Sequence, residues 1–127
     1  MASEVCGCAP YSETLVCSEE SWNGKKYEKK YPEGTPQLTV VQMTIPARTS
    51  LPWHTHPMPN AAYILSGQMT VEELATGRTR TFKAGEAFPE SVDDTHRGTT
   101  GDEETVVIVT YASVAGLPLS VPTADNA

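Results

Sequence analysis

Residues 51–60 read Leu-Pro-Trp-His-Thr-His-Pro-Met-Pro-Asn, and this stretch decides what backbone surrounds the paired histidines. Each proline lacks an amide donor and crowds the preceding turn, so the three prolines exclude a helix. In an extended segment, residues two apart point to the same side, and His54 and His56 therefore share one face. Two neutral imidazoles on one face can bind one cation, although two polar residues in a surface loop would show the same spacing.

The same alternation, continued beyond the prolines, points Met58, Asn60, Ala62 and Ile64 to the side of the histidines. Such a face is mostly apolar and carries one amide. We therefore expect a pocket with a polar head beside the histidines and an apolar wall.

Short strands joined by turns are expected along most of the chain. Ten prolines and nine glycines are scattered through it, and no long apolar stripe has helical spacing. The expected strands cover residues 37–45, 63–66, 69–74, 78–83 and 105–111. In the first of them Val41, Met43 and Ile45 share one face, with Leu38 and Val40 on the other. This pattern predicts an all-β sandwich or small barrel.

Composition excludes several classes of function. The chain has 127 residues, 39% of them apolar, and a net charge of −7. One domain of this size can bury its own core without a disulfide or a metal. An acidic chain is repelled by the phosphate backbone of nucleic acid, so we do not expect nucleic acid as a partner. No apolar run approaches the length of a membrane span, so we do not expect a membrane as a partner either. The first residues lack the features of a signal peptide, which predicts a cytoplasmic protein.

Residues 1–36 have a different composition and are expected to form an N-terminal arm with an edge strand. All three cysteines, Cys6, Cys8 and Cys17, lie there. Cys6 and Cys8 could form a redox or soft-metal clip, or simply be thiols in a terminal arm. Four of the nine positive charges lie in residues 25–30, which fits a basic ligand patch or lysines on a solvated edge strand.

The histidine spacing resembles that of the cupin superfamily of small β-barrels. Its first motif, Gly-x5-His-x-His-x3,4-Glu-x6-Gly, is matched by His54, His56 and Gly67, and Gly85 and His96 match the ends of the second, Gly-x5-Pro-x-Gly-x2-His-x3-Asn. The resemblance covers about residues 37–115. It implies a cupin-type double-stranded β-helix, or jelly roll, over these residues, with an extended C-terminal tail over 116–127.

Several motif positions differ from the family pattern. Arg48 and Asp93 stand where the motifs have glycine, Ser91 replaces the proline, and Thr100 replaces the asparagine. We expect these changes to alter loop shape rather than function. Asn60 replaces the glutamate that is commonly the fourth metal ligand, and a neutral amide is a poor substitute. Asn60 is therefore expected to hold a metal-bound water or the substrate, as a catalytic residue.

The resemblance implies a mononuclear centre in which His54, His56 and His96 hold one divalent transition metal ion. Fe²⁺ is the first choice, and Zn²⁺, Ni²⁺, Mn²⁺ and Cu²⁺ also bind imidazole. Three neutral ligands would leave the charge of the ion uncompensated, which favours an anionic substrate. The expected function is a dioxygenase-like enzyme acting on a small oxygenated or anionic molecule. A non-catalytic binding or sensing protein and a metal-dependent isomerase or lyase are the alternatives.

Further residues could contribute to this site. Glu73, Glu90, Asp93 or Asp94 could be a general base or the missing ligand, or the aspartates could cap a turn while Glu73 faces water. Apolar side chains could line the pocket or belong to the core: Met43, Trp53, Met58, Ala62, Tyr63 and Phe88. The resemblance also implies a homodimer that pairs through residues 20–45.

Overall fold

The computed structural model describes residues 9–126 and consists almost entirely of β-structure. The strands are β1 (Pro36–Ile45), β2 (His54–Thr55), β3 (Asn60–Ser66), β4 (Gln68–Glu73), β5 (Thr79–Lys83), β6 (Ala87–Pro89), β7 (His96–Thr100), β8 (Thr105–Val114) and β9 (Val121–Pro122). One short 3-10 turn, Ala124–Asn126, follows β9. None of the helices in residues 9–126 has the length and apolar character that crossing a membrane requires.

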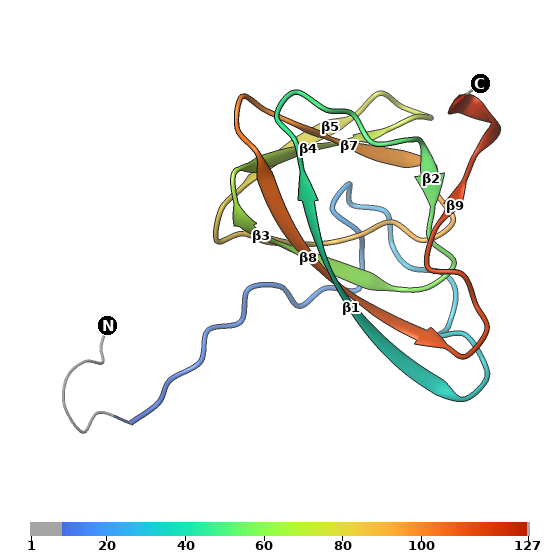
Figure 1. Cartoon of the computed structure of the whole chain (residues 1–127). Helices are drawn as coiled ribbons and strands as arrows, with labels where there is room; N and C mark the ends of the chain where they lie inside the picture. Colours follow the sequence, from blue (N-terminus) through green and yellow to red (C-terminus); the bar gives the residue numbers. More distant parts are fainter. Residues whose placement is uncertain (1–8, 127) are drawn as a thin grey trace.

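Two antiparallel sheets face one another and enclose the core (Figure 1). The first has the strand order β1-β8-β3-β6, and the second has the order β5-β4-β7-β2-β9. Strand β1 pairs with β8 along its whole length, from Pro36 opposite Val114 to Ile45 opposite Thr105. The expected all-β jelly roll is confirmed.

Alternation along the strands builds the core between the sheets. In β3 the buried residues are Asn60, Ala62 and Ile64, and the same side of the preceding segment carries His56 and Met58, all of them buried. The expected parity therefore continues past Pro57 and Pro59. In β1 the side chain of Ile45 is buried, whereas Leu38 and Val40 are 77% and 65% exposed, as their position on the other face predicts.

The second sheet brings two distant histidines into register. Strand β2 pairs with β7 so that His54 lies opposite His96. On its other side β2 pairs with β9, which belongs to the C-terminal tail. Figure 1 shows this tail returning beside β2. The tail expected as an extended arm is thus packed against the strand that carries the histidines.

The N-terminal segment is anchored at Trp22, whose side chain is buried and whose amide donates to the carbonyl of Pro89 at 2.9 Å. In residues 9–35 the structure forms one isolated bridge, Glu20 with Lys26, in place of the expected edge strand. Lysines at four of six positions leave no alternating apolar face that would bury such a strand. Cys17 is exposed, and Cys6 and Cys8 lie outside the described residues.

Two residues that replace motif glycines have a left-handed backbone conformation. Arg48 and Asp93 have φ values of 50° and 58°, and they stand where the family motifs have their opening and internal glycines. The left-handed conformation is normally disfavoured for residues with a Cβ. The expectation of altered loop shape stays a prediction, while these two residues adopt a conformation that glycine adopts without strain.

Candidate metal centre

The three histidines form one compact cluster between the sheets. The ring centroids of His54 and His96 are 4.5 Å apart, those of His54 and His56 are 4.8 Å apart, and those of His56 and His96 are 5.0 Å apart. One potential ligand atom from each lies within 4.8 Å of the others. His56 and His96 are 2% and 1% exposed, so the surrounding packing restrains their rings.

A backbone carbonyl fixes the tautomer of each ring. The Nδ1 atoms of His54, His56 and His96 lie 2.8, 2.9 and 2.7 Å from the carbonyl oxygens of Pro52, Leu119 and Asp94. A carbonyl can only accept, so each Nδ1 carries the proton. Each Nε2 is then left with a lone pair for a cation. Carbonyl partners of this kind orient metal-binding histidines in proteins.

Glu90 contributes a carboxylate to the same place. It follows β6, its side chain is 12% exposed, and its two oxygens lie 3.2 Å from Nε2 of His96 and 3.8 Å from Nε2 of His56. Of the carboxylates that could supply the fourth ligand, Glu90 is the one that the fold brings to the histidines. The expectation of an uncompensated dipositive ion is corrected, because the protein itself supplies one negative charge.

Burial and charge shift the pKa values of the cluster in different directions. Burial lowers the pKa of His54 and His56, which favours their neutral form. Burial also opposes protonation of His96, but the adjacent Glu90 carboxylate outweighs it and raises the pKa of His96. Burial would raise the pKa of Glu90, yet His96 and the other two imidazoles lower it to about 2. Glu90 is therefore ionised across the physiological range.

This donor set fits a divalent transition metal ion. Nε2 of His56 and Nε2 of His96 are buried and have no hydrogen-bond partner among the described residues. With Nδ1 protonated, their lone pairs face the Glu90 carboxylate, and two acceptors repel unless a proton or a cation lies between them. Three imidazoles and one carboxylate are donors that Fe²⁺, Zn²⁺, Mn²⁺, Ni²⁺ and Cu²⁺ accept.

A cavity of about 230 Å³ opens beside the cluster. Both sheets and the C-terminal tail line it, and most of the lining is apolar. Three of the expected pocket residues, Met43, Ala62 and Phe88, belong to its wall. The hydroxyl-bearing Tyr111 also lines it, with its ring 5.7 Å from that of His56. Burial and the charge of Glu90 raise the pKa of Tyr111 to about 12, so its hydroxyl stays protonated.

The other expected pocket residues lie elsewhere. Met58 is fully buried in the core, and Tyr63 points to the opposite side of β3 from Ala62. The backbone of Trp53 is bound by Asn126, which accepts from its amide at 2.5 Å and donates to its carbonyl at 2.7 Å. The guanidinium of Arg97 lies over the Trp53 ring at 4.2 Å from its centroid.

Asn60 is buried, but it does not line the histidine cavity. Its Nδ2 donates to the carbonyl of Met58 at 3.1 Å, and its Oδ1 has no partner among the described residues. It lines a larger hollow of about 570 Å³ between the N-terminal segment and the outside of the first sheet. A catalytic role for Asn60 stays a prediction.

The remaining carboxylates are held away from the histidines. Glu73 is buried and accepts a hydrogen bond from the Thr76 hydroxyl at 2.7 Å, so it does not face water. Asp94 accepts from Nδ2 of Asn23 at 3.4 Å. Asp93 occupies the turn and pairs with Lys29 at 2.5 Å. These two aspartates therefore have the structural role that was the alternative to a general base or a metal ligand.

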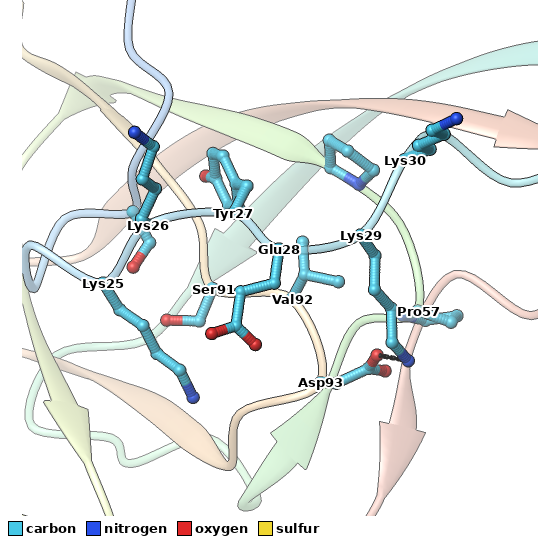
Figure 2. Close-up of a pocket in the computed structure, with 12 residues that line it drawn as sticks. Lys25, Lys26, Tyr27, Glu28, Lys29, Lys30, Pro57, Ser91, Val92 and Asp93 are labelled. Atoms are coloured by element: carbon cyan, nitrogen blue, oxygen red, sulfur yellow. Dashed lines mark hydrogen bonds and ion pairs between the residues drawn. The ribbon is translucent and has the colours of Figure 1, made fainter.

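The clustered lysines surround a separate hollow of about 130 Å³ (Figure 2). The side chains of Lys25, Lys26, Lys29 and Lys30 extend from one segment that passes over Ser91 and Val92, and the dashed line marks the Lys29–Asp93 ion pair. None of these lysines lines the histidine cavity. The cluster of four lysines therefore lies around a different hollow from the cavity of the proposed metal centre.

The sequence and fold place the chain in a known family. The cupin domain family model matches residues 41–111, which include all three histidines, and the chain belongs to the cupin family. No protein with a curated description matches the chain.

Solved structures with the same fold have diverse descriptions. A cupin-like protein from Thermotoga maritima is 16% identical with a TM-score of 0.58, over 68% of this chain and 64% of that one. The DMSP lyase DddQ from Ruegeria pomeroyi is 19% identical with a TM-score of 0.60, over 79% and 47%. The polyketide cyclase RemF from Streptomyces resistomycificus is 23% identical with a TM-score of 0.56, over 68% and 60%. These similarities show the fold, and the chain spans less than two thirds of each of these proteins.

Proposed function

We propose that the protein is a mononuclear metal-dependent enzyme that converts a small oxygen-bearing molecule, with dioxygenase-like chemistry as the first candidate. The observation that carries this proposal is the cluster of three histidines whose ligand atoms lie within 4.8 Å of one another, with the Glu90 carboxylate 3.2 Å from Nε2 of His96. The adjoining cavity provides room for a substrate. A structural role for the ion would not require such a cavity.

The residues of the chain have distinct parts in this proposal. His54, His56, His96 and Glu90 would hold the ion, with Fe²⁺ as the first candidate. When bound, such an ion supplies a Lewis acid and, if it is iron, the electrons that dioxygen chemistry requires. The neutral hydroxyl of Tyr111 would donate a hydrogen bond to a ligand in the cavity, and the apolar walls would contact its hydrocarbon part.

A metal-dependent lyase or isomerase is the second candidate. Tyr111 supports it, because a neutral hydroxyl that lines the cavity can donate a proton to a substrate. A non-catalytic binding or sensing cupin is the third.

Metal analysis tests the centre itself. Protein purified without an affinity tag is loaded with Fe²⁺ under argon, and bound iron is measured in the wild type, His96→Ala and Thr99→Ala. Thr99 is the matched control, because it lies on β7 and its hydroxyl contacts Ser50 on the outer face. We expect His96→Ala to lose about 100-fold or more in affinity and Thr99→Ala to match the wild type. Equal iron contents in all three proteins would overturn the proposal.

Turnover distinguishes the reaction classes. Candidate chelating substrates are incubated with the loaded protein, with and without dioxygen. Consumption of dioxygen together with the substrate supports the dioxygenase, and conversion under argon supports the lyase or isomerase. Recovery of every ligand unchanged in both conditions supports the binding protein.

We also propose that the protein forms a homodimer. Strand β1 is the edge of the first sheet, and the outward side chains of Leu38 and Val40 are the most exposed large apolar side chains of that sheet. An exposed apolar edge of this kind is stabilised by pairing with a second chain.

A further inference from the structure

We infer that the histidine cavity selects a molecule with one singly charged, chelating oxygen head and a compact apolar body. This inference names the substrate class of the proposed metal site and rests on that proposal. It differs from the expectation of a generally anionic substrate, because it excludes a second charge.

The wall of the cavity is apolar on both sheets. Val107 and Val109 from β8 and Phe88 from β6 line it from the first sheet, and Met69 and Val71 from β4 line it from the second. All five are at most 5% exposed, so packing restrains their side chains. A hydrocarbon body gains free energy by leaving water for such a surface.

The charge balance of the cavity allows one negative charge from the ligand. With the imidazoles neutral, a divalent ion and the Glu90 carboxylate sum to one positive charge, which a monoanionic head would neutralise. A second negative charge would need a cationic partner. Among residues 9–126, no lysine or arginine lines this cavity, and the lysine cluster lies around the separate hollow of Figure 2. An unpaired charge in an apolar cavity is strongly disfavoured.

The few polar groups are placed at the head rather than along the body. Apart from the histidines and Glu90, the hydroxyl-bearing side chains of the lining are Tyr111 and Ser120. Tyr111 lies beside His56, where its hydroxyl can donate to an oxygen of the chelating head. The cavity volume of about 230 Å³ suits a compact body rather than a long chain or a sugar polymer.

Two 2-oxo acids form a matched pair of probes. 4-Methyl-2-oxopentanoate and 2-oxoglutarate have the same chelating head, and their tails differ in carrying a branched hydrocarbon or a carboxylate. Each is titrated into Co²⁺-loaded protein, and binding is followed through the visible absorption of the cobalt. We expect the branched acid to bind at least about tenfold more tightly. Metal-free protein is the control, and neither acid should bind to it with comparable affinity.

A lysine placed in the cavity should reverse this preference. Met43 lines the cavity from β1 and is only partly buried, so Met43→Lys can bring an ammonium to the tail of the ligand. Gln42→Lys adds the same charge one residue away, on the exposed outer face of β1, and is the matched control. We expect Met43→Lys to gain affinity for 2-oxoglutarate relative to the branched acid and Gln42→Lys to keep the order of the wild type. If Met43→Lys does not fold, the two probes on the wild type decide the question.

The outcomes distinguish this inference about the ligand from the proposed metal centre on which it rests. Tighter binding of the branched acid supports the inference. Equal or tighter binding of 2-oxoglutarate, or a bound metal with no response to either acid, overturns it and leaves the metal centre intact. Failure of the wild type to retain any divalent ion overturns both.

Discussion

Glu90 is the carboxylate that the fold places against the Nε2 atoms of His56 and His96. Glu90→Gln keeps the size of this side chain but removes its charge. We expect the affinity for a divalent ion to fall by about 10- to 100-fold, because one anionic donor is lost. Competition with a chromophoric chelator measures this change. Glu104→Gln, at an exposed position, is the control, and equal affinities in the two variants would show that Glu90 is not a ligand.

The stability of the metal-free protein should depend on pH through Glu90 and His96. The pKa of Glu90 falls from 4.5 to about 2, so its contribution to stability is present above pH 4.5 and is lost as the pH falls toward 2. The pKa of His96 is raised above 6.5, so its contribution is complete below pH 6.5 and is lost as the pH rises through the folded-state value. The difference in melting temperature between the wild type and Glu90→Gln should therefore be largest between pH 4.5 and 6.5. A difference that does not vary from pH 3 to 9 would contradict this.

The sequence predicts the histidines better than their partners. His54 and His56 share a face through local spacing, and a family motif adds His96. Glu90 could not be singled out among four carboxylates, because its position depends on how the two sheets pack at the end of β6. Tyr111 lies in an apolar run typical of a core strand, and only the inward face of β8 brings it to the cavity.

The C-terminal tail is an element that positions the centre. Its Leu119 carbonyl accepts from Nδ1 of His56 at 2.9 Å, and Ser120 and Pro122 belong to the cavity wall. A variant that ends at Pro118 should keep the β-rich circular dichroism spectrum but lose about tenfold or more in metal affinity. Leu119→Ala keeps the backbone carbonyl and is the control for the side chain. Unchanged affinity in the shortened variant would show that the tail has no part in the centre.

Most long strands could be predicted, because alternation and turn residues are local signals. Residues 37–45 correspond to β1, and 69–74 to β4, within one residue at each end. Strand β3 begins three residues earlier than expected, at Asn60, because the alternation continues as a paired strand directly after Pro59. Strands β6 and β9 have three and two residues, too few to show a period. Their pairing comes from tertiary packing, and so does the docking of the tail.

The whole molecule should be a homodimer if the outer face of β1 is an interface. Light scattering coupled to size exclusion should give twice the chain mass for the wild type. Val40→Glu places a charge on this face and should shift the population to monomers. Thr81→Glu, on an exposed position of β5 in the other sheet, should stay dimeric. A wild type that remains monomeric at every concentration would refute the interface.

Trp53 gives the molecule an optical reporter of its own centre. It precedes His54 directly, and Asn126 and Arg97 hold its backbone and ring in place. The chain has one other tryptophan, Trp22, whose amide donates to the carbonyl of Pro89. A paramagnetic ion bound by the histidines should therefore quench the emission of Trp53. Trp53→Phe isolates the emission of Trp22, so the quenching at each indole can be measured without any added label.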